Sequence, residues 1–225
     1  MFLYETHCHT KESSLCARNS ASEVVEFYLS KGYTGIFVTD HFINGNARVN
    51  RERPNAPYKE KVEEFFLGYE EVKKAAKDKL DVFFGVEMSY KGTDVLLYNV
   101  TKEWLLALDE EHVCNMRKMI RKANEDGIFT VQAHPFREDS YIDHIRLFPD
   151  VQGVETFNAN RNELCNSLGD YYAEQYKKPK LGGSDLHWTT QKLLSGMAFE
   201  KRLESAAEFV ELVKDGKGQI IKMEL

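Results

Sequence analysis

The sequence predicts an α/β protein whose strands form a barrel. Short apolar runs alternate with longer segments of helical periodicity along the 225 residues, the pattern of β-α units around a parallel sheet. Ionisable side chains gather where the predicted strands end, and in a β/α barrel those ends meet at one mouth. The barrel is therefore favoured over an open, doubly wound sheet. Linker-like stretches do not interrupt the pattern, so we expect a single domain over residues 1–225.

The first half of the chain begins with a predicted strand at residues 2–7. A helix follows in SASEVVEFYLSKGY, with Ser20 or Ser22 as N-cap and Gly32 at its end. The apolar run TGIFVTDH predicts a buried strand, and residues 44–57 form an irregular polar segment. Residues 58–79 have the periodicity of one long helix, which leads into the strand LDVFFGVEMSY.

The second half of the chain continues the alternation, for a total of about seven or eight strands. One or two helices are expected in residues 101–127, ending at Gly127, and two more at about residues 160–176 and 204–214. The predicted strands of this half are DVLLYNV, IFTVQAH, VQGVETFN, KPKLGGSD and SGMAFE.

Composition excludes several classes of protein. The formal net charge of -6, without a long Lys/Arg run, disfavours generic nucleic-acid binding. Four scattered cysteines without a Cys-x-x-Cys pair indicate reduced thiols and a cytoplasmic protein. The start MFLYE does not resemble a signal peptide, and apolar runs fall short of the roughly 20 residues that span a membrane. We therefore expect neither export nor membrane insertion.

The ends of five predicted strands carry metal-ligating residue types. His7 and His9 lie two apart in a strand, so their side chains project to the same side. Glu87 lies in an apolar run, where a buried carboxylate is costly without a cation or a hydrogen-bonded partner. The other residues of this set are Asp40, His41, His134, Asp185 and His187.

The residue types of this set favour a metal centre over ordinary polar positions. Imidazoles and carboxylates are ligands of zinc, iron and manganese, and a carboxylate can bridge two ions. Taken singly, the His-x-His pair could be partly buried polar residues and Asp40 could cap a turn. His112 and His144 fall within predicted helical segments and are expected at the surface.

The motifs ETHCHT, VTDH, GVE, QAHPF and GGSDLH, in this order, closely resemble the polymerase and histidinol phosphatase (PHP) family. The resemblance extends over nearly the whole chain. It implies a distorted (β/α)7, TIM-like barrel whose mouth binds two or three divalent metal ions, commonly zinc, iron or manganese. It also implies hydrolysis of phosphoesters.

The resemblance assigns ligands to three ions. His7, His9, Glu87 and Asp185 resemble the ligands of one ion, and Glu87 would bridge to a further ion that also uses His134. His41 and His187 resemble ligands of the remaining ion.

The sequence departs from the family pattern at two places. Ser14 stands where relatives have an aspartate, and Glu12 would replace that ligand. Asp94 stands where many relatives have a histidine, and it would either bind metal or belong to a turn after Gly92.

The expected activity is that of a metal-dependent phosphoesterase acting on a small phosphorylated metabolite or a short nucleotide. Asp185 and His187 are the candidate catalytic residues at the metals, and Arg137 is the candidate that contacts phosphate. Arg18 and Arg161 are weaker candidates, and Asn158 is expected at the mouth. A C-N bond hydrolase of the amidohydrolase type and a non-catalytic metal- or phosphate-binding subunit remain alternatives, and the oligomeric state is open.

Overall fold

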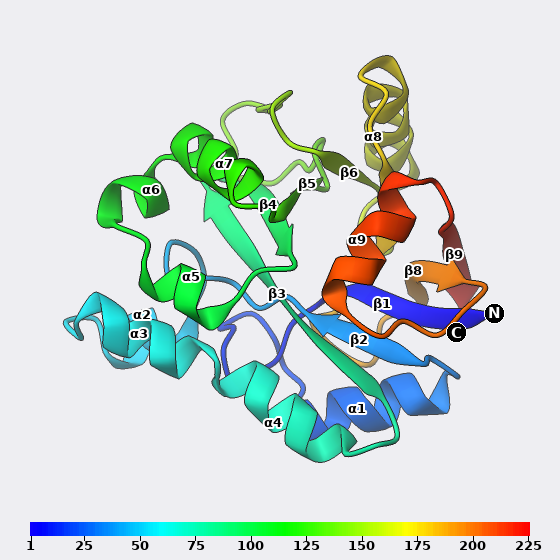
Figure 1. Cartoon of the computed structure of the whole chain (residues 1–225), viewed down its shortest axis with the longest axis horizontal. Helices are drawn as coiled ribbons and strands as arrows, with labels where there is room; N and C mark the ends of the chain where they lie inside the picture. Colours follow the sequence, from blue (N-terminus) through cyan, green and yellow to red (C-terminus); the bar gives the residue numbers. More distant parts are fainter.

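A computed structural model describes residues 1–225, apart from the side chain of Glu110. Within this described part, nine strands form one sheet in the order β7-β6-β5-β4-β3-β2-β1-β8-β9, and β3 runs through the middle of the molecule (Figure 1). The strands are β1 (Phe2–Cys8), β2 (Gly35–Val38), β3 (Asp81–Tyr90), β4 (Thr93–Tyr98), β5 (Phe129–Ala133), β6 (Gly153–Asn158), β7 (Lys180–Gly183), β8 (Leu193–Phe199) and β9 (Gln219–Glu224).

The sheet curls until its first and seventh strands meet. Thr6 Oγ1 in β1 donates a hydrogen bond to the carbonyl of Gly182 in β7 at 2.6 Å. Beyond β7, Leu186 forms a parallel bridge with Cys8, and its carbonyl accepts from the His9 amide at 3.1 Å. The sheet is therefore a nearly closed barrel, and the predicted barrel-like α/β fold is confirmed.

Several strands pair antiparallel, whereas the β-α alternation of the sequence predicted a parallel sheet. β3 and β4 form an antiparallel hairpin, and β4 also pairs antiparallel with β5. Lys91 and Gly92 turn this hairpin with φ angles of 54° and 85°. A two-residue turn with positive φ at both positions matches the twist of the flanking strands. β8 runs antiparallel to both β1 and β9.

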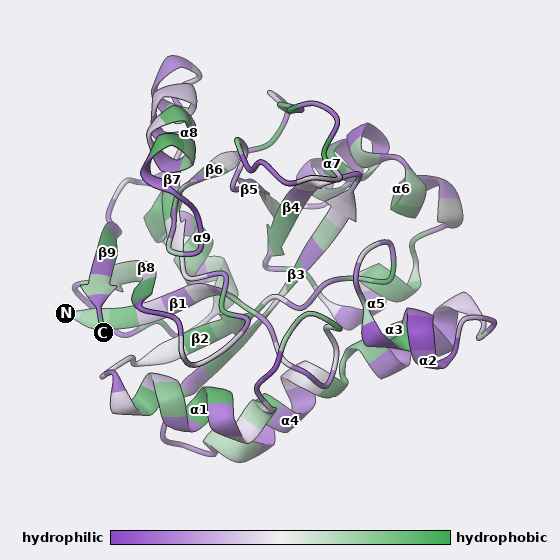
Figure 2. Cartoon of the chain, turned by 180° about the vertical axis from the view of Figure 1, so that it is seen from behind, coloured by the Kyte–Doolittle hydropathy of each residue, from purple (hydrophilic) through white to green (hydrophobic). Residues whose placement is uncertain are grey.

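Helices surround the sheet and alternate between hydrophobic and hydrophilic residues, as α1 and α4 show (Figure 2). In α1 the residues Ala21, Val24, Val25 and Tyr28 are buried, the spacing of one apolar helix face. The helices are α1 (Ala21–Ser30), α2 (Arg48–Glu52), α3 (Tyr58–Phe65), α4 (Leu67–Ala76), α5 (Lys102–Leu106), α6 (Glu110–Cys114), α7 (Met116–Glu125), α8 (Glu163–Gln175) and α9 (Ala206–Lys214).

The long helix predicted over residues 58–79 is broken at Phe66. The Ser13 hydroxyl donates to the carbonyl of Phe65 at 2.7 Å and accepts from the Gly68 amide at 2.9 Å. This side chain replaces a helical hydrogen bond, which separates α3 from α4. Similarly, residues 101–127 form three short helices, because Thr101, Asp109 and Asn115 each cap a new helix.

The end of the barrel opposite its mouth is filled with aromatic side chains. Phe37 in β2 stacks on Phe83 at 5.0 Å between ring centroids, and Phe209 of α9 packs against Phe37 at 4.5 Å. Phe37 and Phe83 each lie four residues before a polar residue of the mouth, His41 and Glu87 respectively. The barrel thus has an apolar floor and a polar mouth, and each buried aromatic ring contributes about 1.5–3 kcal/mol to folding.

Crossing a bilayer requires a longer and more apolar helix than any in the described part of the chain.

Candidate metal centre

Glu87 belongs to β3, and its carboxylate lies at the centre of the barrel mouth. Four imidazoles from three other parts of the sheet surround it, and each of these side chains is buried. The distances to Glu87 are 3.3 Å from His7 Nε2, 3.4 Å from His9 Nε2, 2.7 Å from His41 Nδ1 and 3.4 Å from His134 Nε2. The parallel strands β1 and β2 end at this mouth, and so does β5 from the other side of β3 and β4, which is why residues distant in sequence meet here.

A second buried carboxylate, Asp185, follows β7. Its Oδ1 lies 3.3 Å from His9 Nε2 and 3.6 Å from His7 Nε2. Asp185 has a φ of 52° and His134 has a φ of 27°, in the left-handed region that side chains other than glycine rarely adopt. Backbone strain of this kind costs about 1–3 kcal/mol and gathers at functional sites.

Several buried polar atoms of the mouth have no hydrogen-bond partner among the described residues. They include His7 Nε2, His9 Nε2, His41 Nδ1 and both carboxylate oxygens of Glu87. The short contact of His41 with Glu87 does not have the geometry of a hydrogen bond. Leaving such groups unpaired is costly, and divalent cations would satisfy all of them at once. The donor set therefore fits zinc, iron or manganese.

The pKa values of these groups show how strongly they interact. Burial raises the pKa of Glu87, but the imidazoles of His41 and His7 outweigh it and hold this pKa well below its usual range. Burial lowers the pKa of His7, but Glu155 and Asp185 raise it well above 6.5. For His9, burial together with His41 and His187 lowers the pKa to about 3. The site thus attracts positive charge, while His9 stays a neutral donor.

Glu155 in β6 lies behind His7 and is a residue that the sequence interpretation missed. His7 Nδ1 donates to Glu155 Oε1 at 2.8 Å, which leaves Nε2 as the nitrogen that faces Glu87 and that would bind a cation after losing its proton. Glu155 Oε2 accepts from the His134 amide at 3.0 Å and from Asn158 Nδ2 at 2.9 Å. Asn158 is therefore buried behind the site and not at the mouth, where we expected it. The available signal was a carboxylate within the apolar run VQGVETFN, the same signal that identified Glu87.

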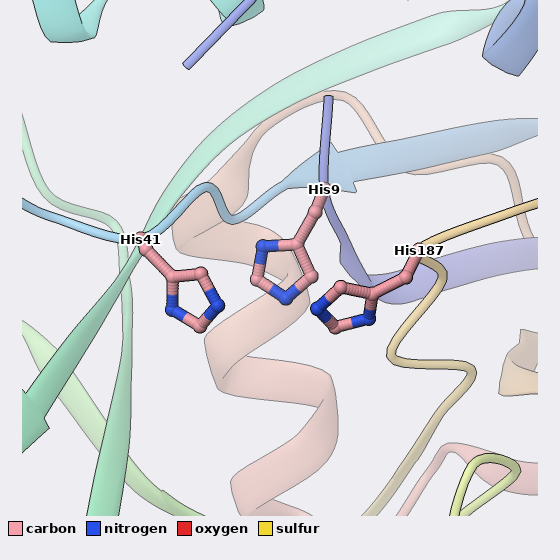
Figure 3. Close-up of side chains that lie close together, drawn as sticks. All are labelled: His9, His41 and His187. Atoms are coloured by element: carbon pink, nitrogen blue, oxygen red, sulfur yellow. The ribbon is translucent and has the colours of Figure 1, made fainter. Parts of the chain in front are cut away.

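His9, His41 and His187 form a second set of possible ligands, which we call the histidine group. One nitrogen of each ring is directed to the space between the three rings (Figure 3). The centroid of the His9 ring lies 4.4 Å from that of His41 and 4.6 Å from that of His187. His187 Nδ1 donates to the carbonyl of Asp185 at 2.8 Å, which leaves Nε2 as the free donor atom of His187.

Asp94 joins the mouth from β4 and not from a turn. It is buried and pairs across the hairpin with Ser89. Its Oδ2 lies 3.8 Å from His134 Nε2, and Asp94, Glu87 and His134 together form a group that could hold an ion. The alternative that Asp94 belongs to the turn after Gly92 is therefore wrong.

Glu12 and Ser14 do not supply the missing ligand that we expected near the histidine group. Both carboxylate oxygens of Glu12 accept from the Ala21 amide at 3.1 Å, at the start of α1. Ser14 Oγ donates to Asp40 Oδ1 at 2.6 Å and accepts from the His41 amide at 3.0 Å. The expectation for Glu12 is thus corrected: its carboxylate binds the first amide of α1, which lies beside the loop that follows β1.

Two arginines lie beside the metal centre. Arg137 Nη1 lies 3.3 Å from Asp94 Oδ2, and Arg161 Nη2 lies 3.0 Å from Asp185 Oδ2. Both line a cavity of about 600 Å³ above the mouth, together with Trp188. Arg18 is exposed, and its backbone amide donates to the carbonyl of His187.

Cys16 also lines this cavity, next to His41 and His187. Burial raises the pKa of the Cys16 thiol, but interactions with His187 and His41 outweigh it and bring the pKa to about 6. His112 and His144 lie away from the centre, each beside an aspartate of its own segment.

Comparisons with known proteins agree with this geometry. The PHP domain family matches residues 5–180. No curated protein sequence matches the chain. A solved two-domain protein from Bacteroides vulgatus that contains a predicted PHP-like metal-dependent phosphoesterase is similar in structure, with a TM-score of 0.69 and 14% identity. The alignment covers 98% of this chain, which spans only 64% of the length of that protein.

Two further solved structures share the fold. PsfC from Pseudomonas syringae has a TM-score of 0.63 and 15% identity, over 100% of this chain and 91% of its own. An amidohydrolase from Chromobacterium violaceum, with bound sulfate and no metal, has a TM-score of 0.50 and 14% identity, over 82% of this chain and 87% of its own. The family match includes Glu87 and the strand-end imidazoles from His7 to His134. The chain therefore belongs to the PHP domain family.

Proposed function

We propose that this protein is a metal-dependent phosphoesterase that hydrolyses a small phosphorylated molecule. The observation that carries the proposal is the arrangement around Glu87. Four imidazoles surround one buried carboxylate whose oxygens lack hydrogen-bond partners among the described residues, and two guanidinium groups lie beside them. A cavity lined by metal cations and arginines can bind the charged oxygens of a phosphoester.

Two or three divalent ions would be held by the mouth. His7, His9, Glu87 and Asp185 would hold one ion, and Glu87 with His134 and Asp94 a further ion. His41 and His187 would contribute to the third. When bound, such ions polarise phosphoryl oxygens and lower the pKa of water, so that a nucleophile forms at neutral pH.

Arg137 and Arg161 would bind the phosphoryl group. Asp94 and Asp185 each hold one guanidinium beside the mouth through an ion pair, so neither arginine must be ordered when the substrate binds. Burial lowers the pKa of Arg137, but Asp94 outweighs this effect, so the side chain stays charged. A planar guanidinium can donate two parallel hydrogen bonds to two phosphoryl oxygens.

The cavity indicates the size of the substrate. Its volume of about 600 Å³ is in the range of sites for small molecules. The net charge of -6 does not favour a long polyanion. A phosphorylated metabolite or a short nucleotide therefore fits better than duplex nucleic acid.

A metal-loaded protein assayed on a panel of phosphomonoesters and phosphodiesters tests the proposal. We expect phosphate or alcohol release that a chelator abolishes, that added zinc or manganese restores, and that Asp185→Asn lowers by at least about 100-fold. The similar fold of an amidohydrolase makes amides and lactones the matched comparison. Turnover of those substrates alone, or a stoichiometric protein partner without any turnover, would contradict a phosphoesterase.

A further inference from the structure

We propose that Cys16 supplies a thiolate ligand to the metal ion that His41 and His187 hold. The inference rests on metal binding at the mouth, which is part of the proposed function. It adds a ligand that neither the family motifs nor the sequence interpretation assigned, and it restricts which metal this position accepts.

The loop that carries Cys16 is fixed above the histidine group by backbone hydrogen bonds. Before Cys16, the Leu15 amide donates to the carbonyl of Asn46 at 3.0 Å. After it, the Arg18 amide donates to the carbonyl of His187 at 2.8 Å. Held on both sides, Cys16 lines the cavity together with His41 and His187.

The ion at this position needs another donor. His9 Nε2 also lies 3.4 Å from Glu87 and 3.3 Å from Asp185, so the ion held by His7 and Asp185 would take this nitrogen. His41 directs Nδ1 to Glu87 at 2.7 Å, which leaves its other ring nitrogen for the ion between the histidines (Figure 3). His187 keeps Nε2 free, because its Nδ1 donates to the Asp185 carbonyl. Two imidazoles alone make a weak site, and three protein donors with one open position are typical of catalytic zinc.

The other residues near the loop are occupied elsewhere. Glu12 binds the start of α1, and the Ser14 hydroxyl lies between Asp40 and the His41 amide. Cys8 is buried in β1, with its sulfur 3.9 Å from the His9 carbonyl. This leaves Cys16, which lines the cavity with both of these histidines, as the donor from this loop.

A thiolate changes the metal preference of the position. Soft and borderline ions such as zinc, ferrous iron and cobalt bind sulfur well, whereas manganese and magnesium prefer oxygen. Two imidazoles and a thiolate should therefore bind zinc or iron tightly and manganese poorly. The carboxylate-rich positions around Glu87 would accept manganese as well.

Cobalt(II) reconstitution of the full chain tests the proposal, because thiolate-to-cobalt charge transfer gives a near-ultraviolet band that imidazole and carboxylate ligands do not. We compare the unaltered protein with Cys16→Ser, Cys16→Asp and the control Cys114→Ser, whose thiol is exposed on α6. We expect the band in the unaltered protein and the control only. Elemental analysis should show one ion fewer per chain in Cys16→Ser, and Cys16→Asp should keep that ion without the band.

A band that persists in Cys16→Ser, or an ion count unchanged by that substitution, would overturn the proposal. A normal ion count without any band in the unaltered protein would overturn the thiolate ligand and leave the proposed phosphoesterase intact. A folded protein that binds no ion would overturn both.

Should Cys16→Ser fail to fold, alkylation of the unaltered protein gives the answer: zinc should slow modification of Cys16 at least about 10-fold and leave Cys114 unaffected. Equal rates with and without zinc would contradict the ligand.

Discussion

His7 Nδ1 donates a hydrogen bond to Glu155 Oε1 at 2.8 Å, and this contact determines which nitrogen of His7 faces the metal centre. Glu155 also accepts from the His134 amide, so one carboxylate orients two candidate ligands. Both partners lie within the barrel, where neither the side chains nor the tautomer can rearrange easily. The organisation of the centre thus depends on a residue that would not itself bind a metal.

Glu155→Gln should weaken metal binding by about 10–100-fold. The amide of glutamine must place its NH2 against either the His7 Nδ1-H or the His134 N-H, and two donors then face each other. The measurement is a competition titration with a chromophoric chelator. Glu163→Gln, at an exposed position in the first turn of α8, is the control and should bind metal like the unaltered protein. Equal affinity in both variants would contradict the orienting role.

Arg137→Lys and Arg161→Lys should each lower kcat/KM for the phosphorylated substrate by about 10-fold or more, with metal content unchanged. Lysine keeps the charge but loses the planar pair of donors that matches two phosphoryl oxygens. Steady-state kinetics together with elemental analysis separate this effect from loss of metal. Arg121→Lys, on the exposed surface of α7, serves as the control. Loss of metal in either arginine variant would assign it a structural role instead.

Gly68→Ala should destabilise the fold by about 1–3 kcal/mol and weaken metal binding. An added Cβ would collide with Thr10 Oγ1 and Asp40 Oδ2. Asp40 accepts from Ser14, and Ser14 accepts from the His41 amide, so the displacement reaches a candidate ligand. Urea unfolding of the metal-free protein and a metal titration measure the two effects.

Gly169→Ala in α8 is the matched control for this substitution. The nearest atom to its added Cβ would be Pro135 Cγ at 3.5 Å, an ordinary contact. Alanine in a helix interior is favoured over glycine by about 0.5–1 kcal/mol, so this variant should be as stable as the unaltered protein or more so. If both glycine variants lost the same stability, close packing at Gly68 would not be the cause.

Tyr172→Phe should make the protein less sensitive to alkaline pH. Burial, followed by the neighbouring Tyr176, raises the pKa of Tyr172 to about 12, against about 10 in an unfolded chain. The folded state therefore keeps a proton that the unfolded state loses, and the stability from this group, complete below pH 10, decreases as the pH rises toward 12. Urea unfolding at pH 8 and pH 11 should show a smaller difference for the variant.

The hydroxyl of Tyr172 has no hydrogen-bond partner in the described part of the chain, so phenylalanine should cost no stability at pH 8. Tyr171→Phe, at an exposed position beside it, is the control and should behave like the unaltered protein. An unchanged alkaline loss in Tyr172→Phe would contradict the raised pKa.

The barrel-like fold and the strand-end ligand candidates could be predicted because both follow from local regularities. Residues two apart in a strand share a side, which places His7 and His9 together before any tertiary contact is known. A carboxylate inside an apolar run, such as Glu87, needs a cation or hydrogen bonds wherever the strand lies. These rules depend on periodicity and on the cost of burying charge, and the sequence carries both.

Tertiary structure alone decided how the loop after β1 meets the centre. Glu12 lies closer in sequence to the His-x-His pair than Cys16, yet Cys16 lines the cavity with His41 and His187 while Glu12 binds the first amide of α1. The path of this loop is set by hydrogen bonds to Asn46 and His187, which are distant in sequence. The same holds for the hydrogen bond between Glu155 and His7, which joins β6 to β1. Such contacts form only when the barrel closes, and spacing along the chain does not encode them.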